Sequence, residues 1–214
     1  MPSGAVLDAD DWREVARLCH EHNLLLIYDG AMERLLFDGR SPLHPVREAG
    51  MAGRTLVIGS LSKEFRMIGW RVGWVAGPRD LIDGVGWAHV YNTTTPVGIA
   101  RAAATAVLRG DHGHVADAAA ELQRRRDTIL AALPDLPLVR PAGGWSLLLD
   151  TAALGVDPAA ASATLLRDGA GAATAMTGWG GEVAARYVRF VFSAEPVEAL
   201  RTLPERIAAT SLRG

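Results

Sequence analysis

The sequence predicts an α/β protein whose first half contains a mainly parallel sheet. Two short, continuous apolar runs, Leu24–Tyr28 and Thr55–Gly59, are typical of strands buried on both faces. A third run, Arg71–Ala76, alternates like a strand and ends at Gly77 and Pro78. Helical patterns alternate with these runs along the chain, and this alternation favours a sheet covered by helices.

The first predicted helix follows Asp8 and Asp10, and Asp10 is the expected N-cap. Its apolar residues recur at helical spacing: Trp12, Val15, Ala16, Leu18 and Cys19. A helix is expected to start at 78–84 and to end before a break at 92–96. Further helices are expected at 97–109, 115–133, 158–167 and 197–209, and strands at 145–149 and 187–192. The break at residues 109–113 predicts a boundary between two parts, 1–112 and a smaller α+β part, 113–214.

Composition excludes several classes of protein. The 214 residues carry 22 basic and 24 acidic side chains, a formal charge of −2, which leaves no basic footprint for nucleic acid. The single cysteine, Cys19, excludes a disulfide framework and a cysteine zinc cluster, and the six histidines show no ligand spacing. We also find no apolar run long enough to span a membrane and no signal pattern. We therefore expect a cytoplasmic protein without a metal, bound to neither nucleic acid nor membrane.

Only one of the 22 basic residues, Lys63, is lysine, and the other 21 are arginine. Arginine can replace lysine wherever positive charge alone is needed. It cannot replace an amine that must lose its proton, because guanidinium stays protonated. Lys63 is therefore a candidate nucleophile. The run Arg124–Arg126, in contrast, is expected to form a solvated helix face.

Several polar residues follow the predicted strands, where ligands bind in open parallel sheets. Asp29 follows the first strand, Ser60 and Lys63 follow the second, and Arg71 begins the third. A primary amine can condense with the aldehyde of pyridoxal phosphate, and a buried carboxylate can keep its pyridine nitrogen protonated. Hydroxyls and an arginine can bind its phosphate. This set of residue types therefore indicates a pyridoxal phosphate site.

The same residues resemble a known family. The segments Ser60-Leu61-Ser62-Lys63 and Gly69-Trp70-Arg71-Val72-Gly73 are similar to the lysine signature of fold-type I, class I/II aminotransferases. Pro2-Ser3-Gly4 resembles the end of that family's Asn-Pro-Thr-Gly turn, and Pro141–Trp145 its Pro-x-Gly-Gly-aromatic stretch. Tyr187–Phe190 resembles the strand that carries its carboxylate-binding arginine. The motifs occur in the family's order along the chain.

The resemblance implies a fold and roles for individual residues. Residues 1–112 would be part of the large, cofactor-binding domain, and 113–214 the C-terminal segment of the small domain. Lys63 would bind the cofactor covalently, and Asp29 would pair with the pyridine nitrogen. The other implied site residues are Ser60, Ser62 and Arg71 for the phosphate and Arg189 for the substrate carboxylate. The implied reaction transfers an amino group between an α-amino acid and a 2-oxo acid, in a homodimer when full-length.

The chain departs from the family pattern in three respects. The family's N-terminal half, with its phosphate loop and ring-stacking aromatic residue, lies outside these 214 residues. Met1 stands where the family has its asparagine, and Met32 where it has a tyrosine. Activity of these residues alone is therefore left open. Two alternatives also stay open: a pyridoxal-phosphate-dependent lyase or decarboxylase on the same fold, and a non-catalytic remnant that associates with other chains.

Overall fold

The computed structural model describes residues 1–210 and 212, and it divides into two compact units. One unit is Leu7–Ala119, and the other combines Met1–Val6 with the chain from Ala120 onward. The division falls within one long helix, α4 (Gly113–Ala132). We call Leu7–Ala119 the first unit and the remainder the second unit, and each is described by itself.

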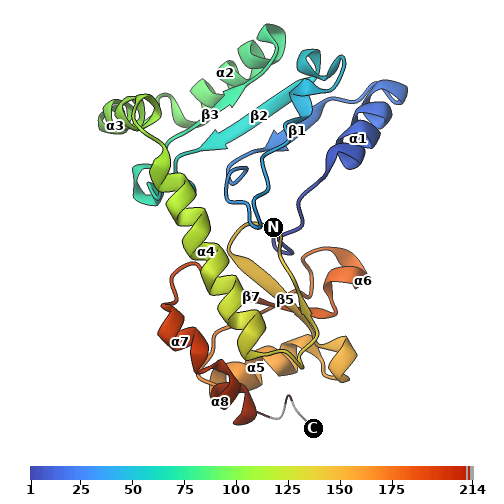
Figure 1. The fold of residues 1–214 in the computed structure, drawn as a ribbon. Coiled ribbons are helices and arrows are strands. Elements are labelled where there is room, and N and C mark those ends of the chain that lie inside the picture. Colours follow the sequence, from blue (N-terminus) through green and yellow to red (C-terminus); the bar gives the residue numbers. More distant parts are fainter. Residues whose placement is uncertain (211, 213–214) are drawn as a thin grey trace. The chain divides into compact units, whose positions relative to one another are not determined.

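The first unit contains a three-stranded sheet in the order β1-β2-β3 (Figure 1). Its strands are β1 (Leu26–Asp29), β2 (Thr55–Ser60) and β3 (Gly73–Ala76), and its helices are α1 (Ala9–Glu21), α2 (Arg79–Thr93) and α3 (Gly98–Arg109). Strands β1 and β2 are parallel, with Leu26 opposite Thr55 and Asp29 opposite Ile58. The predicted α/β class is confirmed.

Strand β3 runs antiparallel to β2, which the sequence pattern did not reveal. The chain between these strands forms a loop with one 3-10 turn, Ile68–Trp70, and contains no crossover helix. Parallel neighbours need a crossover connection, usually a helix, so the loop returns the chain in the opposite direction. The consequence is that the lysine signature forms the connection between two adjacent strands.

Helix α1 begins two residues earlier than the expected cap implies. Asp8, and not Asp10, is the N-cap: its carboxylate accepts hydrogen bonds from the N–H groups of Asp10 and Asp11. The Asp11 side chain accepts from the N–H of Asp8 in return, and the two form a capping box. Two aspartates in one short stretch left the sequence pattern ambiguous between them.

One face of α1 packs on a small core. Ala16 and Cys19 lie against Met51, and Leu26 at the start of β1 packs beside them. Cys19 is 5% exposed and is a free cysteine. The apolar face of α1 thus anchors the first strand, as its helical spacing predicted.

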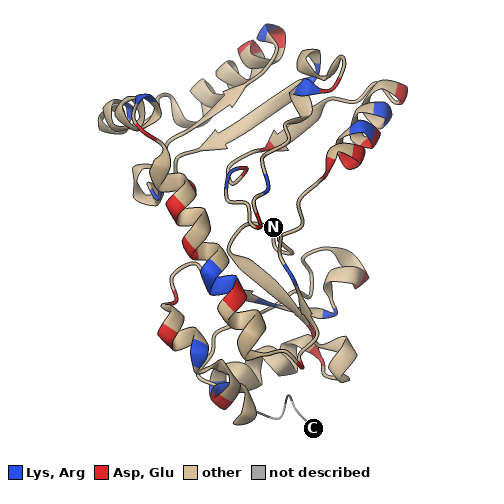
Figure 2. Cartoon of the chain, viewed as in Figure 1, with Lys and Arg blue, Asp and Glu red and all other residues tan. Residues whose placement is uncertain are grey.

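Much of the sheet and of α2 in the first unit is exposed. Ile27 on β1 is 65% exposed, and Trp87 and Tyr91 on α2 are 66% and 86% exposed. Figure 2 shows α2 almost free of charged residues beyond its N-terminal end. The prediction that β1 is buried on both faces is wrong for this structure, because β1 is an edge strand and nothing covers Ile27. Apolar patches of this kind are typical of surfaces that other polypeptides cover.

The second unit contains an antiparallel sheet in the order β4-β5-β7-β6. Besides α4, its elements are β4 (Leu138–Val139), β5 (Ser146–Asp150), α5 (Pro158–Arg167), β6 (Thr174–Ala175), α6 (Gly181–Ala184), β7 (Tyr187–Val191), α7 (Val197–Arg201) and α8 (Leu203–Ala208). Residues Ser146 to Leu149 of β5 are buried, so this strand is at the centre of the core. This α+β architecture agrees with the expectation for the second part of the chain.

The first residues of the chain belong to this second unit. The Ser146 hydroxyl donates to the carbonyl of Pro2 at 2.8 Å, and the N–H of Ala142 donates to the carbonyl of Gly4 at 2.8 Å. Gly4 has a φ of +70°, and a Cβ there would lie 2.3 Å from Cβ of Pro141. Only glycine fits, because both the backbone conformation and the close approach exclude a side chain.

Arg125 and Arg126 do not form the solvated face expected of Arg124–Arg126. Arg126 is completely buried, and its guanidinium donates to the carbonyl of Pro141 at 3.1 Å. Arg125 donates to the carbonyl of Phe192 at 3.2 Å. Only Arg124 is exposed as predicted. Arginines that bind main-chain carbonyls cannot be distinguished from solvated ones by sequence spacing, because their partners are distant in the chain.

Two negative findings apply to the described residues. Within residues 1–210 and 212, no helix combines the length and apolar character needed to cross a membrane. The same part of the chain holds no cluster of three or more His, Cys, Asp or Glu side chains arranged for a metal ion.

An ion pair beside β7 generates a prediction on stability. Arg186 donates through two nitrogens to Asp150, and this hydrogen bonding is the main cause that lowers the pKa of the Asp150 carboxyl. A lowered pKa stabilises the folded state above the unfolded-state value of about 3.9, and the contribution is lost as the pH falls through the folded-state pKa. The side chain of Arg186 is 46% exposed, so solvent screening keeps the contribution small.

We expect Arg186→Gln to lower the free energy of unfolding slightly at pH 7. The deficit should be smaller at about pH 3, because protonation of the Asp150 carboxyl removes the charge that the ion pair stabilises. Denaturant unfolding at both pH values measures it, with Arg201→Gln, an exposed arginine of α7, as the control. A deficit of the same size at both pH values would contradict this origin.

Candidate active site

The lysine signature forms a compact turn after β2. The N–H of Leu61 donates to the carbonyl of Val72 at 3.2 Å, and that of Met67 donates to the carbonyl of Leu61 at 3.1 Å. The N–H of Arg66 donates to the carbonyl of Lys63 at 3.2 Å. These main-chain bonds fix the backbone on both sides of Lys63, which is half-buried.

The two serines and Arg71 lie together in this turn. Ser60 is the last residue of β2, and its hydroxyl accepts from the N–H of Ser62 at 3.1 Å. Arg71 donates from Nη1 to the carbonyl of Ile68 at 2.7 Å and to the Ser62 hydroxyl at 3.4 Å. The structure thus brings Ser60, Ser62 and Arg71 close to one another, as the sequence predicted.

Arg71 adopts a backbone conformation that is rare for a residue with a side chain. Its φ is +55°, in the left-handed region. Such conformations cost free energy and persist where the surrounding structure holds them, often at functional sites. Here the guanidinium donates to the Ile68 carbonyl and to the hydroxyl of Ser62, the residue directly before Lys63.

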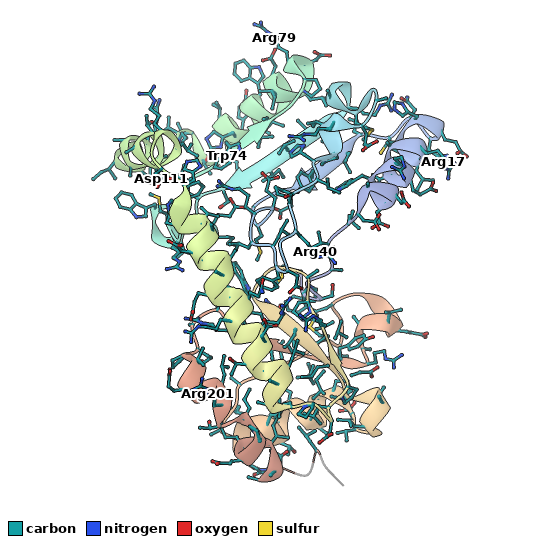
Figure 3. The ribbon with its side chains drawn as sticks, in the orientation of Figure 1. Arg17, Arg40, Trp74, Arg79, Asp111 and Arg201 are labelled. Carbon is teal, nitrogen blue, oxygen red and sulfur yellow. The ribbon has the colours of Figure 1, made fainter. Side chains whose placement is uncertain are left out.

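Two glycines allow β2 and β3 to approach closely next to this turn. A Cβ on Gly73 would lie 2.6 Å from the carbonyl oxygen of Gly59. A Cβ on Gly59 would lie 2.0 Å from the ring of Trp74, which is labelled in Figure 3 and lies over Gly59. Gly73 is also the register partner of Ser60. The glycine of the signature is therefore required by packing.

Asp29 ends β1, at the same edge of the sheet as Ser60. Its register partner is Ile58, and the N–H of Gly30 donates to the Ile58 carbonyl at 2.9 Å. The carboxylate accepts from the N–H of Ala31 at 3.0 Å. The prediction of a buried carboxylate at this position is wrong, because Asp29 is exposed in these 214 residues.

Sequence reasoning missed a buried ion pair next to this cluster. Glu64, directly after Lys63, is 5% exposed and pairs with Arg34 at 2.7 Å. Both residues line a hollow of about 260 Å³ together with Gly30, Ser60 and Trp74. The charge of Glu64 inside the signature was the available signal. Its partner could not be identified, because Arg34 is thirty residues away in the chain.

Tyr28, just before Asp29, has an environment that opposes its ionisation. Burial is the main cause that raises the pKa of its hydroxyl above the ordinary value, and the carboxylate of Glu33 adds to the effect. Its ring makes edge contacts with Trp12 and His44, with centroids 5.5 and 5.1 Å away. Tyr28 therefore remains a neutral packing residue at neutral pH, behind the end of β1.

Arg189 lies in the second unit, on β7, opposite Leu148 of β5 and Thr174 of β6. Its Nε is buried and has no hydrogen-bond partner among the described residues. The guanidinium carbon lies 5.9 Å from the ring centroid of Trp179, within the range of a cation–π contact. A buried donor without an acceptor is costly, so this position favours a ligand that supplies one.

The structure therefore brings together five of the six predicted site residues: Asp29, Ser60, Ser62, Lys63 and Arg71, all in the first unit. Arg189 belongs to the second unit.

This arrangement can be compared with known proteins. The family described as aminotransferase class I and II matches residues 1–206, which is nearly the whole chain. The chain belongs to the class I and II aminotransferases. Members of this family use pyridoxal phosphate, and the resemblance on which the sequence analysis relied is confirmed.

Relatives and solved structures agree with this assignment. The chain is 37% identical to the arginine–pyruvate transaminase of Pseudomonas aeruginosa, over 94% of this chain and 52% of that protein. It is 34% identical to the aspartate/prephenate aminotransferase of Thermus thermophilus, over 78% and 44%. The structure of an aromatic aminotransferase from Pyrococcus horikoshii matches with a TM-score of 0.90 at 30% identity, over 96% of this chain and 56% of the other. The chain thus spans about half the length of the relatives it matches.

The residues present fit the family's cofactor in three respects. Lys63 supplies a primary amine on a fixed turn. Ser60, Ser62 and Arg71 supply donors for a phosphate within one short segment. Asp29 supplies a carboxylate at the same sheet edge, whose exposure in these 214 residues leaves it accessible to a ring nitrogen.

The two glycines at 69 and 73 of the signature provide a test of the packing argument. We expect Gly73→Ala to destabilise the chain by about 1–3 kcal/mol, because its Cβ would meet the Gly59 carbonyl. Gly69→Ala is the matched control, since a Cβ there meets nothing within 4 Å. Denaturant unfolding of both variants measures the difference. Equal losses in the two variants would show that the approach of β2 and β3 is not the constraint.

Proposed function

We propose that this chain takes part in pyridoxal-phosphate-dependent transfer of an amino group between an α-amino acid and a 2-oxo acid. One observation carries the proposal: the only lysine of the chain is fixed in a turn with two serines and an arginine, at the sheet edge where Asp29 ends the neighbouring strand. Family membership supports the same reaction class.

Phosphate binding is assigned to Ser60, Ser62 and Arg71. The hydroxyls and the guanidinium are donors suited to a dianion, and the guanidinium adds the opposite charge. The contact between Arg71 and Ser62 supports joint action on one anion. In this orientation Arg71 has a left-handed backbone conformation, which costs free energy.

Lys63 and Asp29 are assigned to the reacting part of the cofactor. When bound, pyridoxal phosphate supplies an electron sink for the bonds at the substrate Cα. Lys63 would hold the cofactor through its amine. Once released, the amine would accept the proton from the substrate Cα and return it to a carbon of the cofactor. The Asp29 carboxylate would accept a hydrogen bond from the protonated ring nitrogen and so stabilise that charge.

Arg189 is assigned to the substrate's α-carboxylate. Its buried Nε lacks a partner among the described residues, and a carboxylate would satisfy it through a bidentate pair. The contact with the Trp179 ring supports a fixed orientation of the guanidinium.

Several broader features belong to the same proposal. The full-length protein is expected to be a cytoplasmic homodimer, as the family resemblance implies. Residues 1–112 are assigned to the large, cofactor-binding domain and 113–214 to the small domain, except that Met1–Val6 pack in the second unit and residues 113–119 in the first. The division of the chain near the middle of the sequence supports this scheme in outline.

The proposed function can be tested by chemical trapping. The purified chain is equilibrated with pyridoxal phosphate, reduced with borohydride, digested and analysed by mass spectrometry. We expect a pyridoxyl group on Lys63 and none at that position in Lys63→Arg, because guanidinium stays protonated and cannot condense with the aldehyde. The N-terminal amine, present in both proteins, is the internal control. An unmodified Lys63 in the parent chain would contradict the proposal.

A second experiment tests the role of Arg189. An α-amino acid should compete with Lys63 for the cofactor, and so lower trapping, at a concentration at least about tenfold below that of the corresponding amine without a carboxylate. In Arg189→Gln this preference should disappear. Arg186→Gln, which changes the arginine paired with Asp150 beside the same strand, should keep it. A preference that survives in Arg189→Gln would exclude this residue from carboxylate binding.

Product analysis distinguishes amino-group transfer from a lyase or decarboxylase reaction. Incubation with an amino acid and a 2-oxo acid should yield the exchanged pair, whereas a lyase or decarboxylase would release other products without consuming the 2-oxo acid.

A further inference from the structure

A buried carboxylate lies directly beside the proposed cofactor lysine and has no role in the function described above. The side chain of Glu64 is 6% exposed. Its Oε2 accepts from Nε of Arg34 at 2.7 Å, and its Oε1 accepts from the backbone N–H of Arg34 at 2.8 Å. A buried charge requires such partners to be stable. Glu64 therefore holds both the side chain and the main chain of Arg34.

Arg34 is in turn fixed by further contacts in the first unit. Its guanidinium carbon lies 5.0 Å from the ring centroid of Phe65, which is buried. Its Nη1 lies 3.2 Å from Nδ1 of His112, and Nε2 of His112 lies 3.1 Å from the Val107 carbonyl. Because guanidinium can only donate, Nδ1 accepts and Nε2 carries the hydrogen. The contacts run from Glu64 through Arg34 to α3.

The backbone of Arg34 belongs to the loop that follows Asp29. This loop, residues 30–35, is ordered by its own turns: the N–H of Glu33 donates to the Gly30 carbonyl, and that of Leu35 to the Met32 carbonyl, both at 3.1 Å. Leu35 is 2% exposed and anchors the end of the loop. The loop is therefore joined to the lysine turn at Glu64, beyond the point where β1 and β2 pair.

We propose that Glu64 is a positioning residue, which acts through Arg34 to hold the Asp29 loop relative to the Lys63 turn. This inference rests on the proposed function and deepens it. The Asp29 carboxylate would favour the protonated form of a pyridine nitrogen only from within hydrogen-bond distance of it. Asp29 is exposed in these 214 residues, so the fixed loop, and not burial, has to provide that distance.

The test compares Glu64→Gln with a matched control, Glu14→Gln. Both remove one carboxylate charge that pairs with an arginine in the first unit, but the Glu14 pair with Arg17 lies on the exposed surface of α1. Glutamine keeps an oxygen for the Arg34 N–H and loses the charge and the acceptor for Arg34 Nε. The absorption spectrum of the Lys63-bound cofactor is recorded against pH, and the pyridoxal phosphate concentration for half-maximal trapping at Lys63 is measured.

We expect the parent chain and Glu14→Gln to keep one spectrum across the neutral pH range. In Glu64→Gln the ring nitrogen should lose its proton within that range, so the absorption band should shift with pH. The half-maximal concentration should rise on the order of tenfold or more, because a small displacement of a positioned group has effects of this size. A merely structural role for Glu64 would not move the pH at which the spectrum changes.

A double variant separates positioning from stability. Replacing a buried ion pair with apolar residues often preserves stability, so Arg34→Met combined with Glu64→Leu should unfold near the denaturant midpoint of the parent chain. Both this double variant and Glu64→Gln lose the side-chain ion pair between positions 34 and 64, so the double variant should show the same spectral dependence on pH as Glu64→Gln.

Each outcome decides between the two proposals. Identical spectra and trapping in Glu64→Gln and Glu14→Gln would overturn the positioning role and leave the proposed function standing. A double variant that behaves like the parent chain would also overturn it, because the unpaired charge alone would then explain Glu64→Gln. Failure to trap pyridoxal phosphate at Lys63 in the parent chain would overturn the proposed function and this inference with it.

Discussion

The parallel pairing of β1 with β2 is the constraint on which the candidate site depends. Its register places Asp29 beside Ile58, two residues before Ser60. The polar residues that end the two strands therefore lie at the same edge of the sheet. The hydrogen bond from Gly30 to the Ile58 carbonyl extends this pairing into the loop after β1. A shift of one residue would turn every side chain of β1 to the opposite face of the sheet and separate Asp29 from the lysine turn.

The turn after β2 that contains Lys63 adds a second constraint, which concerns the backbone conformation. Gly59 and Gly73 allow β2 and β3 to approach so closely that Trp74 covers Gly59. Arg71 holds a left-handed backbone, and its guanidinium is directed toward Ser62. The left-handed conformation of Arg71 is unfavourable locally, and it occurs at the connection that contains Lys63. Backbone strain of this kind often occurs at functional sites.

The buried polar groups of Glu64 and Arg189 differ in their hydrogen-bond partners. Glu64 is buried directly after Lys63, the residue proposed to bind the cofactor, and Arg34 supplies both a counter-charge and a main-chain donor. The second unit shows the opposite situation at Arg189, whose buried Nε has no hydrogen-bond partner among residues 1–210 and 212. This difference is the basis for proposing a positioning role for Glu64 and a binding role for Arg189.

The sequence by itself determined the family and the α/β class and predicted the site residues, because these depend on local patterns. A single lysine among 21 arginines and the spacing of Ser60, Lys63, Arg71 and Gly73 are readable without a fold. The tertiary structure decided the antiparallel direction of β3, the exposure of β1 and Asp29, and the burial of Arg126. It also decided the partner of Glu64. Each of these depends on residues far apart in the chain, and on which surfaces the folded chain covers, so no local pattern could predict them.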